Sequence, residues 1–147
     1  MSEITAAPSI LKVIAFQLGE NEYALPIQQV QSIEKLIPIT RVPRVVSYIK
    51  GVINLRGVVT PIIDLRKRFG LPEKEYDDGT RIIIATLNEM EVGFIVDGAN
   101  DVLDVSEDLI EPPPAVMGEI EPEFITGVVK LEKRLLILLN LEKILEK

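Results

Sequence analysis

The chain has 147 residues, 47% of them hydrophobic and 27% charged, which is enough apolar material for one domain or for two small domains with a shared core. It contains no Cys, His or Trp, which excludes disulfides, Cys- or His-ligated zinc and every nucleophile that relies on a histidine base. Carboxylate or lysine chemistry stays open, but nothing in the sequence places two acids in one cleft. These absences lower the expectation of an enzyme.

The net charge of −7 and the few aromatic residues, four Phe and three Tyr, argue against nucleic acid as a partner. The N-terminus lacks a basic region followed by a long apolar run, so we expect no signal peptide. The uncharged run Leu135–Leu141 is far shorter than the roughly 20 residues that span a bilayer. These features predict a cytoplasmic protein without membrane insertion, with a flexible tail over residues 1–9.

Charge is distributed in two blocks of opposite sign. Residues 41–68 contain seven Lys or Arg and one acid, whereas residues 73–123 contain fifteen acids and two basic residues. Such blocks can form two oppositely charged faces that orient protein partners. The alternative is that the blocks neutralise each other across the fold.

In chain order, Ile10–Leu18 and Tyr23–Ile27 are predicted to form a hairpin of two strands, because both are rich in β-branched and apolar residues around a short polar turn. Residues 27–34 have apolar side chains at positions 27, 30 and 33, a spacing that predicts a short helix or helical turn. Residues 37–42 are predicted to be a short strand that Pro43 ends.

A second hairpin is predicted over residues 51–65. Its tight turn is at Arg56 and Gly57, and Gly57 can supply the positive φ that such a turn requires. Pro61 cannot donate a hydrogen bond to a neighbouring strand, so we expect it at a sheet edge or a bulge. Asp64 is a candidate N-cap for a basic helical turn over residues 65–69, although this run could also attract phosphate.

The second half of the chain repeats this order. The predicted elements are strands over residues 81–87 and 92–96, an extended Pro-rich loop over 111–115, a hairpin of residues 126–131 and 134–139, and a short helix over 141–147.

This order comes with an internal duplication. A shift of 69 residues aligns residues 13–18 with 82–87, and a shift of 76 aligns residues 49–67 with 125–143, including Gly51 with Gly127. We therefore predict an all-β fold of two small five-stranded barrels, of the SH3 or OB kind, with short helical turns and a C-terminal helix. Each half, about residues 10–78 and 79–147, is marginal for a core of its own, so the halves should fold as one unit.

The matched hairpin tips differ in their chemistry. Residues 54–57 read Asn-Leu-Arg-Gly, whereas their counterparts at 130–133 read Lys-Leu-Glu-Lys. An exposed arginine at a turn can bind a partner carboxylate through two hydrogen bonds, which makes Arg56 a candidate contact residue. The alternative is an ordinary solvated arginine.

No metal or cofactor site is expected. Asp97, Asp101 and Asp104 have a spacing loosely like that of a calcium loop, but the central Gly and the closing Glu of that pattern are missing. Gly51 and Gly57 are six residues apart without a following Lys-Ser or Lys-Thr, so they do not form a phosphate loop.

The run KGVINLRG at 50–57, followed by PIIDLR at 61–66 and FG at 69–70, closely resembles the signature of the CheW family of chemotaxis coupling proteins. FQLGENEYALPI at 16–27, VGFIVDG at 92–98 and FITG at 124–127 agree with it, and the resemblance covers about residues 10–147. It implies one CheW-like domain of two barrels that exchange strands. It also implies a scaffold without catalytic residues, and thus no enzyme. This scaffold links the cytoplasmic tip of a methyl-accepting chemoreceptor to the regulatory domain of the histidine kinase CheA and so controls the kinase.

By the same resemblance, Val30, Ser32 and Arg56 are the expected receptor contacts. The family often has Glu at the position of Ser32, and here Glu34 lies two positions further on. Gly51 is expected to be a position where a larger side chain disturbs function through structure.

Kinase contacts are expected at Ile33, Thr80 and Arg81, and Gly57 is expected to hold the hairpin turn. The alternative function is a small β-barrel module that binds a ligand or an oligonucleotide.

Overall fold

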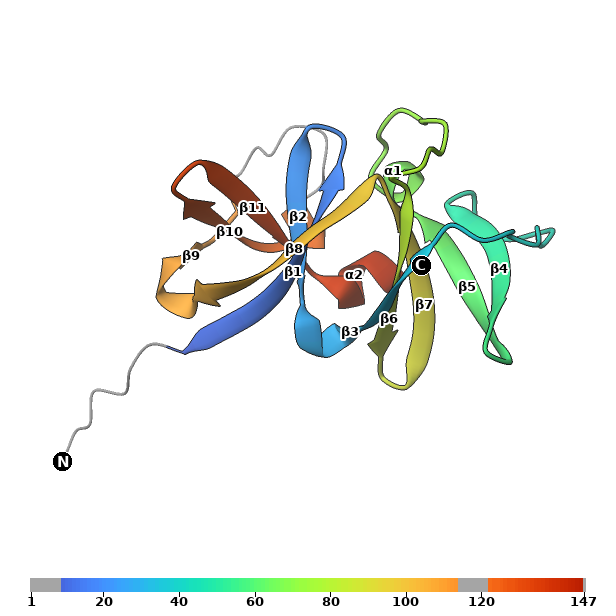
Figure 1. Cartoon of the computed structure of the whole chain (residues 1–147), viewed down its shortest axis with the longest axis horizontal. Coiled ribbons are helices and arrows are strands. Elements are labelled where there is room, and N and C mark those ends of the chain that lie inside the picture. The colour runs from blue at the N-terminus through green and yellow to red at the C-terminus, as the bar shows by residue number, and fades with distance from the viewer. Residues whose placement is uncertain (1–8, 114–121, 147) are drawn as a thin grey trace.

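The computed structural model describes residues 9–113 and 122–146, and its strands form two sheets that lie side by side (Figure 1). The elements in chain order are β1 (Ile10–Leu18), β2 (Asn21–Pro26), η1 (Ile27–Gln29), β3 (Val30–Lys35), β4 (Ile49–Leu55), β5 (Val58–Asp64), α1 (Leu65–Arg68), β6 (Arg81–Leu87), β7 (Met90–Val96), β8 (Gly98–Ser106), η2 (Glu107–Leu109), β9 (Ile110–Glu111), η3 (Pro122–Phe124), β10 (Ile125–Leu131), β11 (Arg134–Leu139) and α2 (Leu141–Leu145).

Each sheet combines strands from the first and the second half of the sequence. The six-stranded sheet has the order β8-β1-β2-β11-β10-β9, and the five-stranded sheet has the order β3-β6-β7-β5-β4. When strands related by the 69- and 76-residue shifts are treated as equivalent, the two orders coincide and β9 is the one addition. The parallel pairs β2–β11 and β5–β7 also correspond. The internal duplication therefore extends to the pairing of the strands.

Both sheets are open ladders. Among the described residues no ladder joins β8 to β9 or β3 to β4, so the expected closed barrels are not confirmed, whereas the mostly-β fold with short helices is. In the five-stranded sheet, the segment between β3 and β4 pairs with β4 at a single isolated bridge, between Thr40 and Val52.

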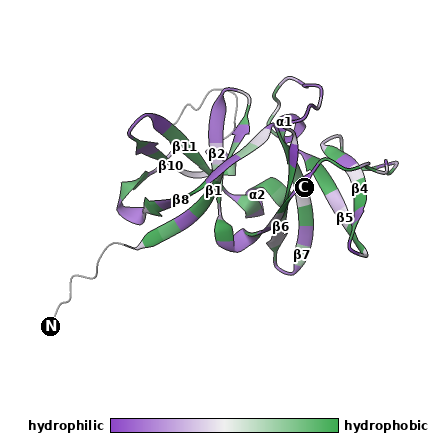
Figure 2. Cartoon of the chain, viewed as in Figure 1, coloured by the Kyte–Doolittle hydropathy of each residue, from purple (hydrophilic) through white to green (hydrophobic). Residues whose placement is uncertain are grey.

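Three apolar clusters hold the fold together. The largest lies between the sheets and contains three ring contacts along Phe16, Tyr23, Phe69 and Phe124, with centroids 5.5–6.0 Å apart. A second cluster packs on the other face of the six-stranded sheet, and a third on the other face of the five-stranded sheet. Apolar residues occur along most strands (Figure 2), because each sheet buries both faces.

The expected helix over residues 27–34 is wrong. Only residues 27–29 are helical, and Val30–Lys35 pair with β6 as strand β3. The register shifts between Val30 and Ser32, where β3 contains one extra residue. This bulge keeps Val30 and Ile33 on one face of the strand. Two apolar residues three positions apart therefore share a face of a strand, although this spacing is typical of a helix.

Two further expectations are wrong. Residues 37–42 form no strand, because only Thr40 pairs with β4. Pro61 lies within β5, an interior strand, and not at an edge or bulge. The missing N–H is tolerated because Val52, which lies opposite Pro61, directs its own N–H and C=O to Thr40, and the ladder with β7 begins only at Ile62. The Pro-rich loop at 111–115 falls partly outside the described residues, and Glu111 belongs to β9.

Candidate interaction surfaces

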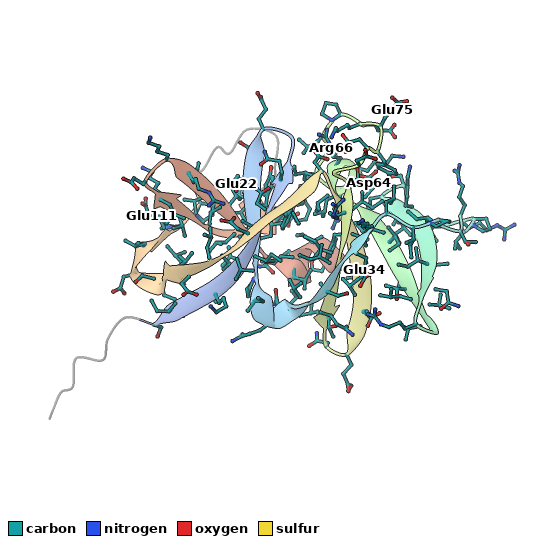
Figure 3. All side chains as sticks on the ribbon, in the orientation of Figure 1. Glu22, Glu34, Asp64, Arg66, Glu75 and Glu111 are labelled. Carbon is teal, nitrogen blue, oxygen red and sulfur yellow. The ribbon has the colours of Figure 1, made fainter. Side chains whose placement is uncertain are left out.

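Arg56 is at the tip of the β4–β5 hairpin. Its φ of 51° and the φ of 86° at Gly57 give the tight turn its left-handed backbone, and the Asn54 Oδ1 accepts a hydrogen bond of 2.9 Å from the Gly57 N–H. The guanidinium Nη1 lies 3.6 Å from Glu34 Oε2, and 62% of the arginine side chain is exposed. One loose ion pair thus leaves most of this guanidinium accessible to a partner. Glu34 is labelled in Figure 3.

The residues expected on β3 are distributed over both of its faces. Val30 lies opposite Ala85 and packs on the shared cluster between the sheets, and Ile33 lies opposite Ile83 and is 38% exposed. Ser32 lies opposite Ile84 on the other face, where its Oγ is buried without a hydrogen-bond partner among the described residues. The structure therefore brings Val30 and Ile33 together and separates Ser32 from them.

Thr80 and Arg81 lie where β6 begins. Thr80 is 3% exposed, and its hydroxyl accepts a 2.9 Å hydrogen bond from the Asp77 N–H. The Arg81 guanidinium donates to the carbonyls of Asp78 and Thr80 at 2.7 and 2.9 Å. Because Arg81 is two residues from Ile83, it shares the face of Ile33, whereas the buried Thr80 hydroxyl holds the turn together.

Gly51 and Gly57 are needed for different reasons. Gly51 has a φ of 152°, and a Cβ there would collide with the Thr40 carbonyl oxygen and lie 2.9 Å from Ile39 Cγ2. Gly57 has open space around it and is needed for its positive φ alone. Gly51 therefore permits the close approach of two backbone segments, and Gly57 permits a turn.

The three aspartates with calcium-like spacing bind three different cations. Asp97 pairs with Arg66, Asp101 with Arg134, and Asp104 with Lys12. Within the part of the chain that the structure describes, no group of three or more acidic residues could hold a metal ion.

The Arg66–Asp97 pair joins the two sheets, and the sequence analysis did not identify it. The Arg66 Nε and Nη2 donate to the two carboxylate oxygens at 3.0 and 2.6 Å, and the Gly19 N–H donates to Oδ2 at 2.7 Å. Both side chains are about 15% exposed. Burial acts to raise the pKa of Asp97, but the hydrogen bonds from Arg66 and Gly19 outweigh it and lower this pKa. No local signal relates positions 31 residues apart, so only the fold could reveal the pair.

A second ion network lies on the six-stranded sheet. Arg134 donates to both carboxylate oxygens of Glu22, at 2.9 and 2.6 Å, and to both of Asp101, at 3.0 and 2.8 Å. These hydrogen bonds lower the pKa of Glu22 and of Asp101 and raise that of Arg134. We assign this network to the stability of the fold, because its charged groups neutralise one another.

The two charge blocks neutralise each other only in part. From the basic block, Arg66 and Lys67 pair with acids of the acidic block, and Arg56 pairs with Glu34. Arg68 donates to carbonyls at the end of α2 and lies over the rings of Tyr48 and Phe124. The remaining cations of the block, which have no ion pair within residues 9–113 and 122–146, are Arg41, Arg44 and Lys50.

No helix in the described part of the chain is long and apolar enough to span a membrane.

The chain matches the CheW-like domain family over residues 12–147. It belongs to this family. It is 52% identical over 136 residues to the chemotaxis protein CheW of Bacillus subtilis, a match that covers 92% of this chain and 87% of that protein. It is 40% identical over 132 residues to the chemotaxis protein CheW of Klebsiella aerogenes, with 90% and 80% covered.

A solved structure gives the same result. The scaffolding protein TtCheW from Thermoanaerobacter tengcongensis superimposes with a TM-score of 0.88 at 36% identity, over 96% of this chain and 94% of that one. The resemblance inferred from the sequence motifs is confirmed.

Proposed function

We propose that this chain is a non-catalytic scaffold that couples the cytoplasmic tips of chemoreceptors to the histidine kinase CheA and so controls kinase activity. The observation that carries this proposal is the match to the CheW-like domain family over residues 12–147. Such a scaffold would act in the cytoplasm, recruited to receptor arrays at the inner face of the membrane, and would need no cofactor.

The apolar edge of the shared cluster supports a receptor site. Val30 and Leu87 pack on the cluster at this edge. By strand alternation, Val59 is on the same face of β5 as Ile63, and Met90 is on the same face of β7 as Val92. Val59 is 67% and Met90 56% exposed, so the cluster continues into a surface that a helix could cover.

Arg56 would define the position of that helix. It lies at the hairpin tip three residues before Val59, with one loose ion pair to Glu34. An acid on the receptor could replace Glu34, and its charge-assisted hydrogen bonds would fix the helix register while apolar contacts supply most of the affinity. Receptor state can change kinase activity only if the contacts differ between the two states.

The exposed part of β3 around Ile33, with the beginning of β6, is our proposed kinase surface. Strand β3 is an end strand of the five-stranded sheet, and Ile33 and Arg81 share one of its faces. An apolar side chain at an unpaired sheet edge suits docking of a second β module. We expect Ile33→Asp to lose the CheA regulatory domain and to keep the receptor. Val102→Asp, at the matched position of β8 with 46% exposure, is the control.

The experiment is a pull-down of a receptor cytoplasmic fragment and of the CheA regulatory domain. Arg56→Glu is compared with Lys133→Glu, which makes the same charge change at the exposed tip of the matched β10–β11 hairpin. We expect Arg56→Glu to lose the receptor and keep the kinase domain, and Lys133→Glu to keep both, with circular dichroism showing that both variants are folded.

If the wild-type chain captures neither partner, the proposed function is refuted, and the small-module alternative should be tested with ligands and single-stranded oligonucleotides. If both variants lose the receptor equally, net charge matters and Arg56 is not a specific contact.

A further inference from the structure

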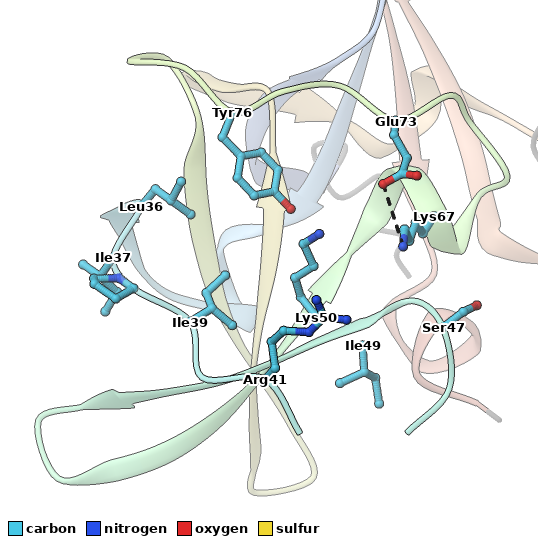
Figure 4. Close-up of a pocket in the computed structure, with 11 residues that line it drawn as sticks. Leu36, Ile37, Ile39, Arg41, Ser47, Ile49, Lys50, Lys67, Glu73 and Tyr76 are labelled. Carbon is cyan, nitrogen blue, oxygen red and sulfur yellow. Dashed lines mark ion pairs between the residues drawn. The ribbon is translucent and has the colours of Figure 1, made fainter. Parts of the chain in front are cut away.

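A cavity of about 710 Å³ lies between the segment that follows β3, the beginning of β4 and the loop that precedes β6 (Figure 4). One wall is apolar and is formed by Leu36, Ile37 and Ile39. These three side chains also pack on the cluster of the five-stranded sheet. Neither Arg56 nor Val30 lines this cavity, so it is separate from the proposed receptor site.

The cavity wall is held in place by backbone contacts. Thr40 and Val52 exchange two hydrogen bonds of 2.9 Å, and the absence of a side chain at Gly51 lets the two segments approach. The segment that carries Ile39 and Arg41 is thereby fixed against β4. The cavity is preformed, which lowers the entropy cost of filling it.

Three cations and one acid line this cavity, so positive charge is in excess. Arg41 and Lys50 both point into its middle (Figure 4), and neither has an ion pair among the residues that the structure describes. Lys67 is paired with Glu73 at 3.8 Å, but Glu73 is 72% exposed and its attraction is screened by water. Two like charges that face one space repel each other, and an anion between them would remove that repulsion.

Tyr76 forms an uncharged wall opposite Ile39. Burial and the nearby Asp64 carboxylate raise the pKa of the phenol, which stays neutral at physiological pH. Its hydroxyl donates to Asp64 Oδ2 at 3.3 Å, and Asp64 Oδ1 also accepts from the Lys67 N–H, so this carboxylate is already engaged. The Lys50 Nζ lies 5.6 Å from the Tyr76 ring centroid. The cavity thus combines an aromatic ring, an aliphatic wall and two available cations.

The rim of the cavity indicates the size of its occupant. Arg41 and Ser47 line the cavity, and between them Val42, Val45 and Val46 are 36–44% exposed. This apolar loop extends the apolar surface beyond the cavity itself. The combined surface is larger than a small molecule would cover. We propose that the cavity binds a short peptide segment of a partner protein in which a carboxylate side chain is flanked by apolar side chains. This proposal does not depend on the coupling function.

The test is a two-dimensional ¹H–¹⁵N NMR titration of the full chain with a blocked five-residue peptide that alternates leucine and glutamate. The matched peptide contains glutamine in place of glutamate. We expect the acidic peptide to cause saturable chemical-shift changes in residues 36–50 and around Tyr76. The affinity of the glutamine peptide should be lower by at least about tenfold, since glutamine cannot form charge-assisted hydrogen bonds. Lys50→Gln and Arg41→Gln should each lower the affinity for the acidic peptide about tenfold.

Lys130→Gln is the control, because it removes an exposed positive charge on β10, in the other sheet. The proposal would be overturned if the acidic peptide caused no saturable shifts or caused them elsewhere. It would also be overturned if Lys130→Gln weakened binding of the acidic peptide as much as Lys50→Gln and Arg41→Gln do. A further titration uses sodium octanoate, a free apolar carboxylate. If octanoate binds at the cavity as tightly as the peptide, the site takes small carboxylates and the peptide assignment is wrong. All of these measurements proceed without receptor or kinase, so their outcome is independent of the proposed function.

Discussion

The two sheets share one strand order but use the arginines of their matched hairpins differently. In the five-stranded sheet, Arg56 occupies the hairpin tip, is 62% exposed and has one ion pair of 3.6 Å. In the six-stranded sheet, Arg134 begins β11, is 32% exposed and donates four hydrogen bonds to Glu22 and Asp101. The duplicated scaffold thus has one arginine available to a partner and one that stabilises the sheet.

The features that the sheets share concern the backbone. The register shifts at Gly51 in β4 and at Gly127 in β10, and each glycine lies against the segment that precedes its hairpin. Asp64 and Asn140, 76 residues apart, each cap a short helix by accepting from the N–H three residues on. What was kept after duplication is the geometry that makes the fold, and what diverged is the surface chemistry.

The largest effect is expected where the two sheets agree. Gly51→Val and Gly127→Val should each cost at least about 3 kcal/mol of unfolding free energy, because a side chain would collide with backbone at both positions. Gly57→Ala, which meets open space but keeps a φ of 86°, should cost only about 1 kcal/mol. Urea unfolding measures all three, and a Gly51→Val variant as stable as the wild type would contradict the close approach.

The next effect concerns the Arg66–Asp97 ion pair, which joins the two halves of the chain. Asp97→Asn should cost about 3 kcal/mol, because it leaves the largely buried Arg66 guanidinium without its counter-charge. The 69-residue shift relates Asp97 to Gln28, which is exposed. Gln28→Ala should therefore change the unfolding free energy by less than about 0.5 kcal/mol. Equal costs at the two positions would show that the ion pair does not stabilise the fold.

The same carboxylates predict an acid dependence. The folded-state pKa values of Asp97, Glu22 and Asp101 are lowered, so the unfolded chain binds protons at these groups at higher pH than the folded chain does. Their contribution is complete near pH 7 and is lost as pH falls below about 4, the ordinary value of such groups, towards the lowered values. The unfolding free energy of the wild-type chain should fall from pH 7 to pH 3, and that of the Asp97→Asn variant should fall less steeply. An identical slope in the variant would exclude Asp97 as a source.

The smallest effects compare the two arginines directly. Arg134→Gln should cost about 1 kcal/mol, since it removes a partly exposed network, whereas Arg56→Gln should stay within about 0.5 kcal/mol. In receptor binding the order should reverse, with a loss for Arg56→Gln and none for Arg134→Gln. Thermal unfolding combined with a receptor pull-down tests both, and a large stability loss for Arg56→Gln would indicate a structural arginine.

Much of the local structure could be predicted from the sequence. The hairpins, the turn at Arg56 and Gly57, the N-cap at Asp64 and the short C-terminal helix are confirmed, because each depends on residues close together in the chain. The motif around residues 50–70 also identified the family, and the family match confirms it. The roles expected for Val30, Ser32, Ile33, Thr80 and Arg81 remain predictions, although the structure places Val30 and Ile33 on one face.

The tertiary structure decided what depends on contacts between distant residues. A bulge against β6 made a helix-like spacing part of β3, and the hydrogen bonds from Val52 to Thr40 allowed Pro61 inside a sheet. The Arg66–Asp97 pair and the cation-lined cavity each join segments that are far apart in the sequence. Local residue patterns indicate the secondary structure of most segments, because apolar residues recur about every two positions in a strand and every 3.6 in a helix. Which strands become neighbours, and which charges then remain unpaired, depends on how the whole chain buries its apolar faces.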